Sequence, residues 1–357
     1  MTRPRSADVL VVGNGLTGCL VAAELARAGR RVVVVAAAPP EPPPLGLVPS
    51  GPTLAYAEAV LRWGPDGARE LWSLQRDAQA ELRRLTGLWR GDLAWRAAGG
   101  FLLARTRAEG AALADSEDML RAEGFAGEFL DGYMLEARFD LRAFAAGYWA
   151  EEEAELDARA LADAAAAAAH DAGVTFAGAM RPGQFEVSPE GVRTETGEGS
   201  ARAAVAVVAS AAAVEVLPGF ERLAAAERHG IKAPLRPEAS VPSPARALDG
   251  RFAWTLRRGS LELEFFGSTD AEALRAEHLP VLTGPYETVE ASPLRLSGDG
   301  LPLVGPVPGV PLVAALPAGP DLGWMPLLAR WAVSSLLTGR DATPARLRAA
   351  RTASAML

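Results

Sequence analysis

The sequence has few of the residues from which metal sites and redox-active thiol sites are built. Among its 357 residues there is one cysteine, Cys19, and there are three widely spaced histidines, His170, His229 and His278. A single cysteine excludes an intrachain disulfide and any site with several cysteine ligands. Scattered histidines argue against a histidine metal cluster. We therefore expect no bound metal.

Lysine and long apolar runs are also scarce. Lys232 is the only lysine, and the net charge is −8 without basic runs, which argues against nucleic acid as a partner. No uninterrupted apolar stretch reaches the roughly 18 residues needed to cross a bilayer. The apolar run before Gly13 is also shorter than the roughly 7–15 residues of a signal peptide. The sequence predicts a soluble, cytoplasmic protein with no membrane span.

The order of secondary-structure signals points to two domains. At both ends of the chain, buried-strand patterns alternate with helical ones, whereas the middle is rich in short strands and hairpins such as 252–267. This order predicts an α/β fold: a Rossmann-like nucleotide-binding domain with an inserted antiparallel-sheet domain. We assign residues 1–85, 150–220 and 295–357 to the nucleotide-binding domain. The sheet domain, which we expect to hold the substrate, takes residues 86–149 and 221–294.

One short motif carries the nucleotide-binding prediction. Residues 13–18, Gly13-Asn14-Gly15-Leu16-Thr17-Gly18, match G-x-G-x-x-G between an apolar strand and a helix. The first glycine permits a tight turn, the second lets a pyrophosphate approach the backbone, and the third lets the helix pack on the strand. The N-terminus of the helix then presents N–H groups to the phosphates.

The end of the second predicted strand departs from this pattern. An Asp or Glu about 20 residues beyond the glycines normally accepts the ribose hydroxyls, but here Ala36 occupies that place. Losing such charge-assisted hydrogen bonds costs roughly 1.5–3 kcal/mol each, which is tenfold or more in affinity. The sequence leaves open whether the nucleotide site is weakened or lost.

A second motif near the C-terminus suggests a family. Together with the opening motif, "GDGLPLVGPVPGVPLVAAL" (298–316) resembles the FAD-dependent D-amino-acid oxidase superfamily, in the branch of glycine, sarcosine and γ-glutamylputrescine oxidases. "GLVPSGP" (46–52) falls where that family has a flavin-contacting segment. The resemblance implies a glutathione-reductase-type fold and favours FAD over NAD as the cofactor. Besides 13–18 and Ala36, the residues that it places at FAD are Ser50, Gly51, Ala209, Gly300, Gly323, Trp324 and Met325.

The resemblance has departures at positions that would face the cofactor or the substrate. The family has an arginine that anchors the substrate carboxylate; Leu294 fills that position here, and Arg295 follows it. Ala211 replaces a glycine, and the loop after Leu316 lacks the family's histidine. Arg295 is our candidate for the carboxylate anchor.

Two functions of different kinds follow. The first is an FAD-dependent oxidoreductase that oxidises a C–N bond of a small amine or amino acid by hydride transfer to flavin N5. The second is a catalytically degenerate protein of the same fold that acts as a partner or structural subunit of an oxidoreductase complex. An NAD(P)-linked reductase leaves the late motif unexplained.

Overall fold

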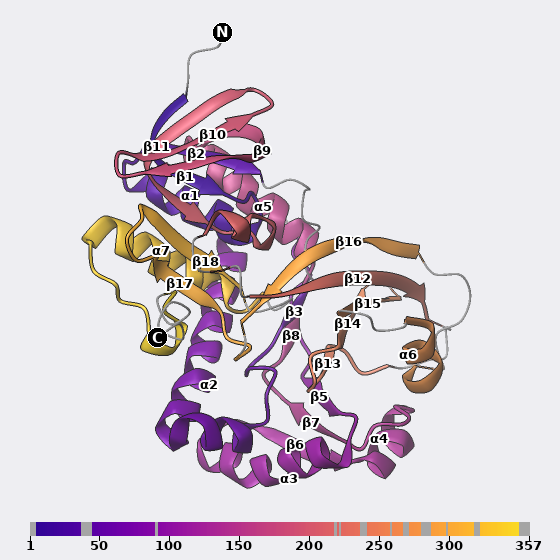
Figure 1. Cartoon of the computed structure of the whole chain (residues 1–357). Coiled ribbons are helices and arrows are strands. Elements are labelled where there is room, and N and C mark those ends of the chain that lie inside the picture. The colour runs from indigo at the N-terminus through magenta and orange to yellow at the C-terminus, as the bar shows by residue number, and fades with distance from the viewer. Residues whose placement is uncertain are drawn as a thin grey trace.

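The computed structural model describes residues 5–36, 45–89, 92–217, 220, 223–235, 241–257, 259–266, 271–279, 287–297, 299–317 and 322–349. The strands form a seven-stranded, an eight-stranded and a three-stranded sheet. In Figure 1 the seven-stranded sheet lies at the top and the eight-stranded sheet at the lower right. We call these the first and the second sheet.

The first sheet is mostly parallel. Its parallel part has the order β9-β2-β1-β11-β18, with β17 antiparallel at the edge and β10 antiparallel between β9 and β11. The strands are β1 (Arg5–Val12), β2 (Val32–Ala36), β9 (Thr175–Ser188), β10 (Gly191–Thr196), β11 (Gly199–Val208), β17 (Leu303–Pro306) and β18 (Leu312–Leu316). The central strands are apolar without alternation because both of their faces are covered.

Different elements cover the two faces of the first sheet. On one face a hydrophobic cluster joins the sheet to α1 (Leu16–Arg27), α5 (Ala158–Asp171) and α7 (Met325–Thr338). On the other face a second cluster includes Ala213 of the short 3-10 helix η1 (Ala211–Val216) and the neighbouring Leu217 and Phe220. A further 3-10 turn, η2 (Ala345–Leu347), lies near the C-terminal end of the described chain.

The second sheet combines two distant parts of the chain. Residues 100–150 and 224–296 supply its strands, and a parallel pairing of β5 with β13 joins the two sets. The strands are β5 (Gly100–Ala104), β6 (Gly127–Asp131), β7 (Ala146–Ala150), β12 (Ala224–Pro234), β13 (Ala245–Ala247), β14 (Phe252–Arg257), β15 (Ser260–Phe266) and β16 (Glu287–Leu296). One face packs into a core with α4 (Gly132–Phe139) and with Leu279, which follows α6 (Ala271–His278). Because side chains alternate along a strand, the other face carries the intervening residues.

Two elements connect the sheets. The long helix α2 (Tyr56–Leu88), kinked at Gly64, runs down one side of the molecule toward α3 (Arg107–Ala122) (Figure 1). The three-stranded sheet consists of β3 (Leu47–Val48), β8 (Ala154–Glu155) and β4 (Arg96–Ala97).

The predicted fold class is confirmed: a Rossmann-like domain carries an inserted sheet, which is antiparallel except for the parallel pairing of β5 with β13. The strands of the first sheet come from residues 5–36, 175–208 and 303–316, whereas the domain boundaries placed at residues 85, 149, 220 and 294 stay a prediction. Helix α2 extends on both sides of the Gly64-Pro65 kink, and apolar residues at helical spacing over 69–85 mark only the part after the kink.

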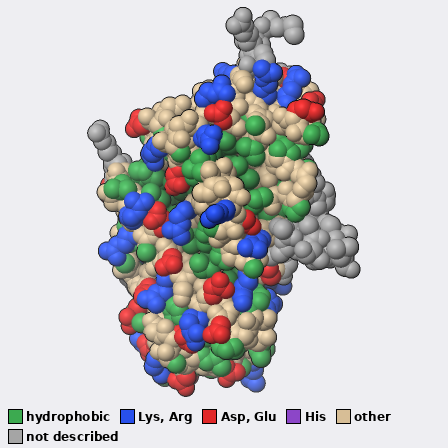
Figure 2. All heavy atoms as spheres, turned by 90° about the vertical axis from the view of Figure 1, so that its left-hand side faces the viewer, with side chains coloured by type: hydrophobic (Ala, Val, Ile, Leu, Met, Phe, Trp, Pro, Cys, Tyr) green, Lys and Arg blue, Asp and Glu red, His purple; other side chains and the backbone are tan. Residues whose placement is uncertain are grey.

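The surface and the helices bear on possible partners. Acidic and basic side chains intermingle over the face shown in Figure 2 rather than gathering by sign. In the part of the chain that the structure describes, no helix is both long and apolar enough to cross a membrane. Within the same residues, no group of three or more His, Cys, Asp or Glu side chains is placed to hold a metal ion.

Candidate functional site

The glycine-rich turn between β1 and α1 is closely packed at its first and third glycines. Gly13 has φ +114°, and a Cβ there would lie 2.9 Å from the Cβ of Ser210. A Cβ on Gly18 would lie 1.9 Å from the carbonyl oxygen of Gly13. The backbone N–H of Gly13 donates to Val35 at 2.8 Å, which ties the turn to the end of β2. These two glycines therefore fix the turn.

The middle glycine is open. No atom lies within 4 Å of a Cβ built on Gly15, and both Asn14 and Gly15 are exposed. Gly15 is also the N-cap of α1, which has no side-chain cap and no acid in its first turn. The uncapped N–H groups and the positive end of the helix dipole suit an anionic phosphate. Leu16 and Thr17 are buried and anchor the helix.

The neighbouring strand ends complete this edge of the sheet. Ala36 ends β2, and Ala209 follows β11 and donates its N–H to Val12 at 2.8 Å. Since β2, β1 and β11 are adjacent and parallel, Gly13, Ala36 and Ala209 meet at their carboxyl ends, where doubly wound folds bind nucleotides. The residues present fit the pyrophosphate of a dinucleotide, but Ala36 supplies no carboxylate for the ribose.

The residues expected around a flavin ring lie on two segments that touch. Leu322, just before α7, donates its N–H to Leu47 at 3.2 Å and thereby joins 322–325 to 46–52. Trp324 and Met325 are only 3% and 7% exposed and belong to the same apolar cluster as Leu16. Gly323 and Ser50 are buried as well. The structure thus brings these residues together, with their side chains packed into the core.

Two further predicted residues lie on β16 and on the turn that follows it. Gly300 is exposed in the turn between β16 and β17, with φ +71° and open space around its Cβ position. The backbone of Arg295 lies in β16 opposite Ala225, and Leu294 lies opposite Ala226. The side chain of Arg295 is outside the described residues, so its role as an anchor stays a prediction.

Two ion pairs that the sequence did not reveal lie on the second sheet, on the face opposite its core. Arg228 and Glu264 are 9% and 8% exposed, and their Nη1 and Oε1 atoms are 3.6 Å apart. Burial raises the pKa of Glu264 to about 7, although Arg228 and the N–H of Leu45 act in the opposite direction. The contact with Leu45 places Glu264 beside segment 46–52. The second pair, Arg246 with Glu153, contacts Gly51 of the same segment.

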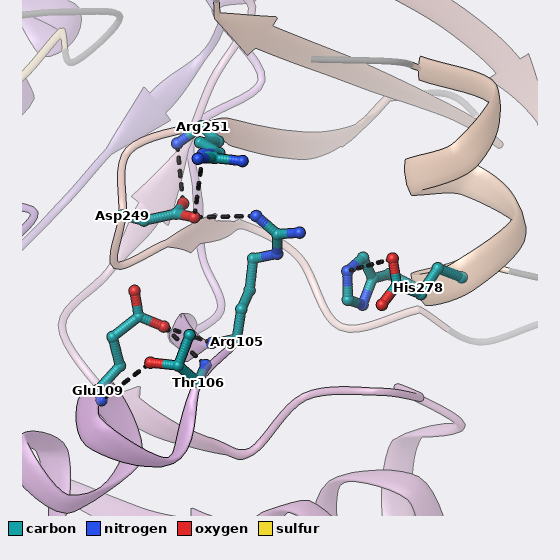
Figure 3. Close-up of polar contacts among 7 residues, drawn as sticks. Arg105, Thr106, Glu109, Asp249, Arg251 and His278 are labelled. Atoms are coloured by element: carbon teal, nitrogen blue, oxygen red, sulfur yellow. Dashed lines mark hydrogen bonds and ion pairs between the residues drawn. The ribbon is translucent and has the colours of Figure 1, made fainter.

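A separate cavity of about 520 Å³ lies at the start of α3 (Figure 3). Arg105 and the backbone N–H of Arg251 both donate to Asp249, each at 3.0 Å. His278 is almost fully buried, and burial lowers its pKa, so the neutral ring donates from Nδ1 to the carbonyl of Arg142. Figure 3 shows the guanidinium groups of Arg105 and Arg251 turned toward Asp249. Because these charges pair with one another, the cavity lining does not indicate a particular kind of ligand.

Comparisons with known proteins address family and fold. Residues 8–334 match the family model described as "DAO: FAD dependent oxidoreductase". No curated protein matches the sequence. Among solved structures, glycine oxidase from Geobacillus kaustophilus is similar, with a TM-score of 0.76 and 18% identity over 97% of this chain and 99% of that chain.

Two further solved structures have the same fold. L-proline dehydrogenase from P. horikoshii has a TM-score of 0.70 and 14% identity over 99% of each chain. L-amino acid deaminase from Proteus vulgaris has a TM-score of 0.71 and 14% identity over 97% of each chain. At these identities the likeness concerns the fold.

Proposed function

Because the chain belongs to the family of FAD-dependent oxidoreductases, we propose that it binds FAD and oxidises a C–N bond of a small amine or amino acid. One observation carries the proposal: α1 has an open, uncapped N-terminus at the carboxyl ends of three adjacent parallel strands. The similar solved structures support the substrate class, since these enzymes are a glycine oxidase, an L-proline dehydrogenase and an L-amino acid deaminase.

The chain's own residues divide the binding task. The N–H groups at the start of α1 bind the pyrophosphate, beside Ala36 and Ala209. Ser50, Gly51, Gly323, Trp324 and Met325 surround the ring and exclude water from it. Helix α7 has no acid in its first turn, so its positive end favours negative charge near Met325.

The substrate would lie between this region and the face of the second sheet that carries Arg228, Glu264 and Arg246. FAD held in this region would accept a hydride from the carbon next to the amino group, and the imine left behind would hydrolyse in water. Arg295 anchors a substrate carboxylate, and Glu264 faces the amino group. Because the pKa of Glu264 is about 7, its carboxyl group can exchange a proton near neutral pH. Positioning and desolvation contribute most of the catalysis that such a reaction needs from side chains.

Substitution of Gly15 by aspartate tests the phosphate site without disturbing the fold. Gly15 has φ −72° and open space around it, and aspartate is a favourable N-cap, so stability should hold. The added carboxylate repels phosphates, and we expect FAD affinity to fall by about a hundredfold or more. Gly87→Ala, at another glycine with open space, is the control and should leave affinity unchanged. Equal affinity of Gly15→Asp and wild type would show that FAD does not bind at this turn.

A second candidate is favoured by two observations. Trp324 and Met325, expected to contact the ring, are packed in the apolar core, and Ala36 lacks the ribose acceptor. Both features suit a degenerate protein that serves as a partner or structural subunit of an oxidoreductase complex. Anaerobic addition of amines and amino acids to the FAD-loaded protein separates the two: loss of flavin colour with one of them supports the enzyme, and persistent colour with all of them supports the subunit.

A further inference from the structure

A buried arginine links the second sheet to the segment expected to contact flavin. Arg246 of β13 is 4% exposed, and Glu153, in the turn between β7 and β8, is 1% exposed. Arg246 Nη1 lies 2.5 Å from Glu153 Oε1. Arg246 Nη2 donates to the carbonyl oxygen of Gly51 at 3.1 Å. One guanidinium therefore holds a carboxylate and a backbone carbonyl from two distant segments.

The close packing around this pair restricts where segment 50–52 can lie. A Cβ on Gly51 would lie 2.5 Å from Nε1 of Trp72, so the backbone presses against α2 on one side. A Cβ on Gly100 would lie 2.7 Å from Oε2 of Glu153, so the carboxylate presses against β5. Interiors packed at this density pass small displacements on to their neighbours. Moving Arg246 would therefore move Gly51.

A small cavity beside the pair contains unsatisfied polar groups. Its volume is about 30 Å³, and its lining includes Ser50, Gly51, Tyr56, Glu153 and Arg246. Glu153 Oε2, Arg246 Nε and the Tyr56 hydroxyl are buried without a hydrogen-bond partner among the described residues. Since one water needs roughly 10–15 Å³ and several polar partners, this space suits ordered water that completes the hydrogen bonding of the pair.

A buried ion pair of this kind is a poor source of stability. Desolvation of two charges offsets most of their attraction, and well-packed apolar residues are often as stable. A role in positioning the backbone explains the Arg246–Glu153 pair better, because a guanidinium offers several donors in a fixed plane. We propose that Arg246 and Glu153 are positioning residues that fix the backbone of segment 50–52 against the bound flavin. This inference rests on the proposed function.

The test removes both charges together, so that neither is left buried and unpaired. We expect the double variant Arg246→Met/Glu153→Leu to unfold close to the wild-type midpoint. Once loaded with FAD, it should bind about tenfold more weakly, the size of effect expected from one lost charged hydrogen bond. Its flavin absorption bands and reduction potential should shift as well, which a purely structural role would not cause. Arg105→Met/Asp249→Asn removes an ion pair at the remote cavity and serves as the matched control.

A single conservative variant guards against failure of the double variant to fold. Arg246→Lys keeps the charge facing Glu153 but cannot hold two partners in one plane, so FAD affinity should fall at least threefold, again with shifted bands. If wild type binds FAD and these variants keep its affinity within twofold with unshifted bands, the positioning role is wrong and the proposed function stands. If wild type binds no FAD at all, the proposed function fails and this inference fails with it.

Discussion

Replacing Glu264 by glutamine is expected to change how the stability of the protein depends on pH. Glu264 is buried on β15, and desolvation raises its pKa from 4.5 to about 7. Between these two values the native protein holds a proton that the unfolded chain has released. Linkage then requires this group's contribution to stability to fall as pH rises from 4.5 to 7, and to be constant outside that window.

The size of the effect follows from the shift. A difference of about 2.5 pKa units, at 1.36 kcal/mol per unit, corresponds to about 3 kcal/mol. Glutamine keeps an acceptor for the Leu45 N–H and does not ionise. The free energy of unfolding of Glu264→Gln minus that of wild type should therefore grow by about 3 kcal/mol between pH 4.5 and 8.

Urea unfolding at intervals across this pH range measures the difference directly. Other titrating groups, and the charge of the nearby Arg228, are common to both proteins and cancel. A difference between Glu264→Gln and wild type that stays constant within about 0.5 kcal/mol would refute the desolvation argument.

Three further outcomes are expected. Ala36→Glu supplies the missing ribose acceptor and should tighten FAD binding about tenfold in a fluorescence titration, whereas unchanged affinity would mean that the ribose does not approach the end of β2. Thr106→Ala removes the capping box of α3, in which Thr106 and Glu109 bond each other's backbone N–H, and should cost about 1 kcal/mol in urea unfolding; no loss would mean that the cap does not form. Burial raises the pKa of the Cys19 thiol to about 12, so at pH 8 a thiol reagent should label the folded protein about a hundredfold more slowly than the unfolded chain, and equal rates would contradict the buried position.

The sequence predicted best those features that depend on neighbouring residues. Gly18 is crowded by the carbonyl of Gly13, five residues away, so the motif spacing between a strand and a helix identifies this part of the turn, whereas Gly13 is crowded by the distant Ser210. The end of α1 and the hairpin between β14 and β15 are local in the same sense. Helix α2 shows the limit of local patterns, since Gly64 and Pro65 interrupt the helical conformation although the helix resumes after the kink.

Features that depend on distant segments were missed for a physical reason. Arg246 stands between two alanines, and its pattern does not show that it meets Gly51, 195 residues away. Glu264 lies in an alternating strand, and alternation separates two faces without telling whether the polar one is covered. The contact of Glu264 with Leu45 shows that the polar face of β15 is covered at this position. The resemblance singled out Trp324 and Met325 as flavin contacts, which stays a prediction, and their burial depends on packing with Leu16 and segment 46–52.

The visible absorption spectrum of the purified protein shows whether the chain binds FAD. The protein would be incubated with excess FAD, and unbound FAD would be removed by gel filtration. We expect flavin bands to elute with the protein at about one FAD per chain, because the open N-terminus of α1 holds the FAD. A colourless protein peak, with all FAD in the small-molecule fraction, would contradict it.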